Sequence, residues 1–125
     1  MRPLFFVILT MIWMSLIFYL SSLPSTSTGP DTLTFKIFSK ALHFFIFGIL
    51  SLHFLFSIKG KKSLQETRLK VFLLSLLLTI TYAITDEYHQ SFSPGRTPSF
   101  KDIIIDTSGA ITFLGVTYFL RLKIL

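Results

Sequence analysis

The chain has 125 residues, of which 51% are hydrophobic and only 14% are charged, and its mean hydropathy is +0.68. Charged residues make up about a quarter of an ordinary soluble domain, so the composition argues against that class. The length leaves room for one domain, and the absence of cysteine excludes disulfides and thiolate metal sites. The net charge of +6 comes from Lys and Arg residues scattered beside apolar runs. This pattern predicts the lipid bilayer as a partner and gives no support for nucleic acid.

Four long apolar runs follow one another along the chain. They predict an all-α membrane protein, a single domain over residues 1–125 folded as a bundle of four transmembrane helices. A helix needs about 20 apolar residues, and at least about 17, to cross the hydrocarbon core. Three runs meet the lower limit, and the third run meets it only by continuing through Asp86 and His89. A soluble bundle would show a polar stripe about every 3.6 residues, which these runs lack. The expected helices cover approximately residues 3–20, 41–58, 71–90 and 103–120.

The first run has the position of a signal peptide but not its features. It extends from Pro3 to Leu20, whereas the apolar core of a signal peptide has about 7–15 residues. No small-x-small cleavage site follows Leu20. We therefore expect a retained helix.

Basic residues predict the orientation, because cytoplasmic loops carry an excess of Lys and Arg. The segment between the second and third runs holds five basic residues and a single acid, Glu66. This loop, and with it both termini, is expected in the cytoplasm. Five of the six acids then fall on the outer side, together with the loop over residues 21–31. The basic residues of the cytoplasmic loop are Lys59, Lys61, Lys62, Arg68 and Lys70.

A polar stretch over residues 85–96 ends the third run and is unlike the rest of the chain. On a helix, Asp86, His89 and Gln90 lie at i, i+3 and i+4, so they share a face. A Pro-Gly pair then breaks the helix and turns the chain. Arg96 follows this turn, and we expect it to fold back toward the carboxylates.

Two further polar groups are expected at the same membrane surface. Asp102, Asp106 and Gly109 lie at i, i+4 and i+7 of the fourth run, and Lys40 and His43 lie at i and i+3 of the second. Ionisable residues inside a bilayer pair with one another, so these groups predict a polar cluster in the outer leaflet. Asp106 lies one turn inside its run and needs a cationic partner. The candidates for this partner are Lys40, His43 and Arg96.

Glycines in the fourth run predict close packing between helices. Gly109 and Gly115 are both expected to let a neighbouring helix approach.

These polar residues resemble the markers of the VanZ-like family. The family carries an acidic pair, a His-Gln or similar pair, Pro-Gly-Arg, Asp, and finally Asn or Asp with Gly. In this chain the markers are Asp86-Glu87-Tyr88-His89-Gln90, Pro94-Gly95-Arg96, Asp102, Asp106 and Gly109. The remaining matches are Lys40 with His43-Phe44 in the second run and Trp13 with Ser21-Ser22 at the end of the first. The position of Asp106 is often Asn in the family, so a role that requires the amide would not carry over.

The resemblance implies a multi-pass protein of the bacterial cell membrane. The founder of the family is associated with low-level teicoplanin resistance. By resemblance, the outer-leaflet polar site would bind or act on a cell-envelope molecule, a precursor or a lipid, and would be linked to glycopeptide resistance.

Two other functions fit the same residues. In a membrane-embedded enzyme acting on a lipid-linked substrate, a carboxylate would be the base and a histidine would shuttle a proton. In a non-enzymatic scaffold or transporter subunit, the cluster would be an ion-paired staple between helices. No cofactor is expected, and no metal, since the chain lacks a His-Glu-x-x-His motif. The catalytic candidates are Asp86, Glu87 and His89. The expected substrate-binding residues are Lys40, His43, Gln90, Arg96, Asp102 and Asp106.

Overall fold

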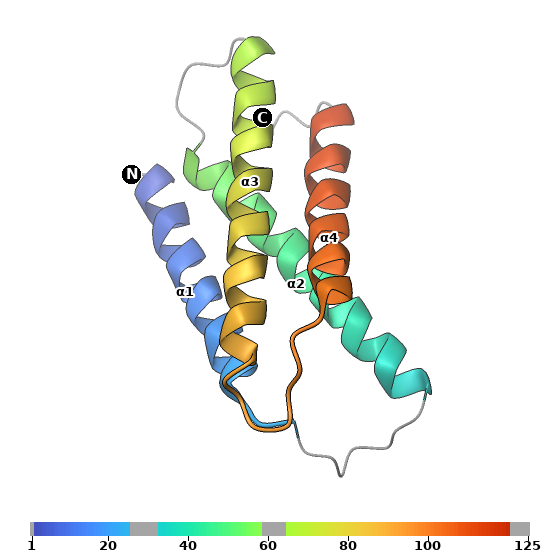
Figure 1. The fold of residues 1–125 in the computed structure, drawn as a ribbon. Helices are drawn as coiled ribbons and strands as arrows, with labels where there is room; N and C mark the ends of the chain where they lie inside the picture. The colour runs from blue at the N-terminus through green and yellow to red at the C-terminus, as the bar shows by residue number, and fades with distance from the viewer. Residues whose placement is uncertain (1, 26–32, 59–64, 121–125) are drawn as a thin grey trace.

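The computed structural model describes residues 2–25, 33–58 and 65–120, and the secondary structure of these residues is entirely helical (Figure 1). The helices are α1 (Arg2–Ser22), α2 (Leu33–Ile58), α3 (Gln65–Gln90) and α4 (Phe100–Phe119). α2 crosses the bundle obliquely behind the other helices (Figure 1) and contacts all three of them. Within the described residues, α1 and α4 make no contact with each other. The predicted all-α bundle is confirmed.

Three of the helices are long and apolar enough to cross a membrane, over Leu4–Ser22, Leu33–Ile58 and Arg68–Gln90. α3 continues past Asp86 to Gln90, which gives the third run the length that a span requires. α4 has 20 residues but carries Lys101, Asp102 and Asp106 near its start, and it falls outside this group. On length and composition alone, three of the four predicted spans are therefore supported.

The outside of the bundle is apolar, while its interior holds many polar side chains. Phe5, Phe38 and Phe119 are 58%, 60% and 80% exposed, and only 17% of the first span is buried. Inside, Ser75 and Thr79 are completely buried and donate hydrogen bonds to carbonyls of the preceding turn. Small hydroxyl side chains let helices approach while their own polar atoms are satisfied. This distribution is that of a multi-pass membrane protein whose solvent is lipid.

A close approach between α2 and α4 depends on Gly109. A Cβ atom at this position would lie 2.0 Å from the carbonyl oxygen of Phe44, a backbone atom that cannot move aside. At Gly48 of α2, a Cβ atom would meet the ring of Phe113 at 2.6 Å. Gly115, by contrast, has nothing within 4 Å. The prediction of close packing is thus right for Gly109 and wrong for Gly115, because a Cβ atom at Gly115 would meet open space.

The two ends of the bundle are formed by different segments of the chain. The start of α1, the start of α3 and the end of α4 lie at one end, and the loop between α3 and α4 lies at the other (Figure 1). We call the second of these the loop end. Much of the basic segment that predicts the cytoplasmic side lies outside the described residues, as do Asp31, Arg121 and Lys123. The assignment of the loop end to the exterior stays a prediction.

We predict that the loop end faces outward and the basic segment faces the cytoplasm. Because the chain has no cysteine, one introduced thiol gives an unambiguous signal. Thr97→Cys, at an exposed loop position, should react with an impermeant maleimide added to intact cells. Ser63→Cys, within the basic segment of the sequence, should react only after permeabilisation. The opposite pattern would invert the orientation.

We predict that Gly109→Ala destabilises the bundle and that Gly115→Ala does not. The added methyl group at Gly109 meets backbone, so the loss should reach or exceed the ~1–3 kcal/mol usual for overpacking. Gly115→Ala is the matched control, since it makes the same change on the same helix in open space. Thermal unfolding of the two purified proteins in detergent measures the difference. Equal melting temperatures would contradict the close approach.

Candidate functional site

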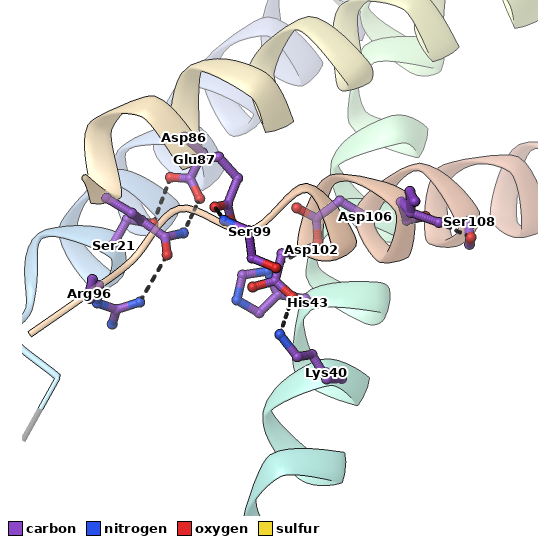
Figure 2. Close-up of polar contacts among 12 residues, drawn as sticks. Ser21, Lys40, His43, Asp86, Glu87, Arg96, Ser99, Asp102, Asp106 and Ser108 are labelled. Carbon is purple, nitrogen blue, oxygen red and sulfur yellow. Dashed lines mark hydrogen bonds and ion pairs between the residues drawn. The ribbon is translucent and has the colours of Figure 1, made fainter. Parts of the chain in front are cut away.

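Polar side chains from all four helices gather at the loop end of the bundle (Figure 2). One group connects α1, α3 and the loop after α3, and a second group connects α2 to α4. Glu87 lies on α3 and reaches the start of α4. We call the following residues the polar cluster: Ser21, Lys40, His43, Asp86, Glu87, Gln90, Arg96, Asp102 and Asp106.

Asp86 is the centre of the first group. Its side chain is buried, and both carboxylate oxygens accept hydrogen bonds. Ser21 Oγ donates to Oδ1 at 2.6 Å, and Gln90 Nε2 donates to Oδ2 at 2.8 Å. A buried carboxylate is costly unless it is hydrogen-bonded, so these two neutral donors hold it in place. The bond to Ser21 also fastens the end of α1 to α3.

Arg96 belongs to the same hydrogen-bond chain but pairs with no carboxylate among the described residues. Its Nη1 donates to Gln90 Oε1 at 3.2 Å, its Nε to the carbonyl of Leu23 at 2.9 Å, and its Nη2 to the carbonyl of Leu20 at 3.3 Å. The expectation that Arg96 folds back onto the carboxylates is therefore wrong. The carbonyls at the C-terminal end of a helix lack partners within the helix and attract a cation, and Arg96 satisfies them at the end of α1.

The Pro94-Gly95 turn brings the loop against the end of α1. Gly95 has a φ of 75°, which favours glycine, and a Cβ atom there would lie 2.7 Å from the carbonyl oxygen of Ser25. The backbone N–H of Ser25 donates to the carbonyl of Pro94 at 3.0 Å. The turn expected from this dipeptide is present, and its contact with the segment after α1 places Arg96.

Two pairs, one helical turn apart, join α2 to α4. Lys40 Nζ forms an ion pair with Asp102, and these side chains are 44% and 14% exposed. His43 Nδ1 lies 3.1 Å from Asp106 Oδ1, and Asp106 is completely buried. Of the three side chains predicted as partners of Asp106, His43 is the one that reaches it, and the contact is a hydrogen bond that a neutral imidazole also forms.

Two buried carboxylates each keep one oxygen without a hydrogen-bond partner among the described residues. Glu87 Oε2 accepts from the backbone N–H of Ser99 at 2.7 Å, just before α4 begins. Its Oε1 has no partner, and neither has Asp106 Oδ2. An unsatisfied buried polar atom costs about 1–3 kcal/mol, so a further hydrogen-bond donor at either oxygen would be favourable.

A cavity of about 250 Å³ opens between α1, α2 and α3 and reaches this network. Its remaining walls are apolar, and among them Leu20, Leu23 and Leu42 are each about 40% exposed on the outside of the bundle. His43 lines the same cavity as Arg96. The polar lining consists of Ser21, Ser39, His43, Asp86, Gln90 and Arg96.

His89, a catalytic candidate, lies outside the cavity. Its ring stacks on Phe18 of α1 with the centroids 4.1 Å apart, and its Nε2 lies 3.4 Å from Ser22 Oγ. Successive residues of an α-helix are separated by about 100°, so His89 turns toward α1 while Gln90 turns into the cavity. The geometry gives no support for His89 as a proton shuttle at this site.

Other predicted residues support the cavity without lining it, and two serines line it without having been predicted. Lys40, Glu87, Asp102 and Asp106 are absent from the cavity wall. Ser21 and Ser39 are present, at the end of α1 and near the start of α2. Serine is common near helix ends, so their sequence positions alone carry little signal. Within the described residues, no three acidic or histidine side chains are arranged as metal ligands.

We predict that the two pairs between α2 and α4 contribute unequally to stability. Lys40→Met removes a half-exposed ion pair, usually worth about 0–1 kcal/mol. His43→Leu leaves the buried Asp106 without its partner and should cost about 3–5 kcal/mol. The His43→Leu/Asp106→Leu double variant should recover most of this loss, because apolar residues can replace a buried pair. Equal melting temperatures of Lys40→Met and His43→Leu in detergent would refute the difference.

Comparison with known proteins identifies the family. None of the curated proteins and none of the solved structures compared with the chain matches it. The model of the VanZ/LLP1 family matches residues 6–121, a range that contains all four helices almost completely and every residue of the polar cluster. The chain belongs to the VanZ/LLP1 family.

Proposed function

We propose that this VanZ/LLP1-family protein binds the anionic headgroup of a cell-envelope lipid or lipid-linked precursor at the outer face of a bacterial membrane. The observation that carries the proposal is the state of Arg96. Its guanidinium lines the cavity, is held by three neutral acceptors, and has no acidic partner among the described residues. Three of its five N–H donors are used, so the other two have no acceptor among the described residues.

A fixed guanidinium favours phosphate and carboxylate ligands. Its planar donors match two oxygens of such a group at once, and charge-assisted hydrogen bonds of this kind are stronger than neutral ones. The three anchoring bonds of Arg96 immobilise the side chain before a ligand arrives. Binding therefore loses less side-chain entropy than it would with a mobile arginine.

The cavity walls support a ligand that carries a lipid chain. Leu20 and Leu23 of the α1 end and Leu42 of α2 line the cavity and are also exposed on the lipid-facing surface. A headgroup held at Arg96 would leave its hydrocarbon chain between α1 and α2. A soluble anion would gain nothing from these apolar walls.

A purely structural cluster fits the geometry less well. A staple gains most when its arginine meets a carboxylate with two hydrogen bonds, and Arg96 instead meets an amide and two carbonyls. Glu87 and Asp106 each keep an unpartnered oxygen. We propose further that binding an envelope molecule at this site influences susceptibility to glycopeptide antibiotics such as teicoplanin, which act outside the cell membrane. The support for this link is the resemblance to the VanZ-like family.

We predict that Arg96→Gln lowers teicoplanin tolerance per unit of membrane-inserted protein. Losing the charge-assisted bonds to a headgroup should weaken binding about tenfold or more. Lys101→Gln is the matched control, since it removes one exposed positive charge at the same end of the bundle outside the cavity. Growth at graded teicoplanin concentrations is compared with immunoblots of the membrane fraction. Equal tolerance per inserted molecule in the two variants would defeat the proposal.

A further inference from the structure

His43 has one ring nitrogen committed to Asp106 while the ring lines the cavity. Its Nδ1 lies 3.1 Å from Asp106 Oδ1, and its Nε2 has no hydrogen-bond partner among the described residues. An ionised carboxylate only accepts hydrogen bonds, so it places the imidazole proton on Nδ1. In the neutral ring, Nε2 then carries the lone pair and acts as a hydrogen-bond acceptor.

The ring of His43 is held firmly. Asp106 is completely buried in α4, and the ring of Phe47, one turn further along α2, lies nearly parallel to the imidazole at a centroid distance of 6.3 Å. A carboxylate partner that fixes the tautomer and the orientation of a histidine is a common device for defining what the second nitrogen does. Asp106 is thus a positioning residue, and His43 is the group that would touch a ligand.

The other polar groups of the cavity define what His43 faces. Arg96 supplies donors, and in Figure 2 it lies at the left, apart from His43 near the centre. Asp86 supplies a negative charge, but both of its oxygens already accept bonds from Ser21 and Gln90. Among its polar lining groups, the cavity therefore offers the charged donors of Arg96 and, at His43, a neutral acceptor. A ligand matches it by presenting an anion to Arg96 and an uncharged donor to His43.

We propose that the cavity selects headgroups that carry both a phosphate and a hydroxyl, as polyol phosphate and sugar phosphate lipids do. The phosphate binds Arg96, and the hydroxyl donates to His43 Nε2. The proposal rests on the proposed function, which assigns the anion to Arg96, and it adds the second contact and the ligand class. A volume of about 250 Å³ equals roughly eight water molecules at about 30 Å³ each, which suits a phosphate with a small polyol.

A matched pair of lipids tests the hydroxyl without any substitution in the protein. Phosphatidylglycerol and phosphatidylethanol carry the same phosphodiester charge and differ in the hydroxyls of the headgroup. The purified chain is placed in phosphatidylcholine nanodiscs with a minor fraction of one test lipid, and the lipids that it retains are counted by native mass spectrometry. We expect phosphatidylglycerol to be retained about fivefold over phosphatidylethanol, the effect of one net hydrogen bond. Equal retention would overturn the proposal.

Phosphatidylethanolamine forms the third arm of the experiment, because its ammonium is a charged donor. An ammonium gains most from a charged acceptor, whereas the acceptor assigned to the ligand is the neutral Nε2, and the carboxylate of Asp86 is already engaged with Ser21 and Gln90. We expect weaker retention of this lipid than of phosphatidylglycerol. Stronger retention would overturn the assignment of a hydroxyl donor.

Arg96→Gln separates this proposal from the proposed function. If Arg96 binds the phosphate, the variant should retain both phosphatidylglycerol and phosphatidylethanol about tenfold less than the parent does. Unchanged retention of both lipids would defeat the proposed function itself. Reduced retention of both, with no preference between them in the parent, would defeat only the contact to His43.

Nitrogen-15 NMR of the histidine rings reports the contact directly. The chain has three histidines, so the His53→Gln and His89→Gln variants assign the three rings. We expect the Nε2 signal of His43 to shift when phosphatidylglycerol is added and to stay unchanged with phosphatidylethanol. No shift with either lipid would overturn the proposal. This readout uses the native His43, whose removal would strand the buried Asp106.

Discussion

The contact between α2 and α4 at Gly109 determines where the polar cluster forms. The carbonyl of Phe44 occupies the space that a Cβ atom would need, so the two helices are locked at this level. Asp106 lies one turn before Gly109, and His43 directly precedes Phe44. The same helix contact therefore holds the carboxylate of Asp106 beside the imidazole of His43. In a bundle surrounded by lipid, no bulk water replaces a lost partner. The glycine therefore fixes both the packing of the helices and the chemistry beside it.

The other half of the site depends on how α1 is attached. α1 packs on α2 and α3 and does not reach α4 among the described residues. Deeper in the bundle, Trp13 Nε1 donates to the carbonyl of Ile46 at 3.1 Å, and Tyr82 donates to the carbonyl of Met14 at 2.7 Å. At the loop end, Ser21 is bonded to Asp86. The cavity lies between these two levels. Its wall of α1 side chains is mostly apolar and separates the polar lining residues from lipid.

Within the polar cluster, neutral hydrogen-bonding groups and charged groups have separate roles. Neutral donors satisfy Asp86, and neutral acceptors anchor Arg96, so the positive charge of the guanidinium is not cancelled by a contact within the described residues. Among the described residues, Lys40 of α2 and Asp102 of α4 pair opposite charges, and this pair lies outside the cavity. This division leaves a cation and a neutral acceptor at the cavity wall, which is the pattern on which both proposals depend.

The sequence by itself determined the helical class, the extension of α3 to Gln90 and the gathering of polar residues at one end, because hydropathy and helical spacing are properties of neighbouring residues. Only the tertiary structure decided the partners. Arg96 donates hydrogen bonds to carbonyls at the end of α1, and His89 stacks on Phe18. Asp106 contacts His43, one of its three predicted partners. Spacing shows which residues share a face but not the neighbour that the face meets. That depends on the rotation and approach of each helix, which are set by contacts between residues distant in the chain, such as Gly109 on Phe44.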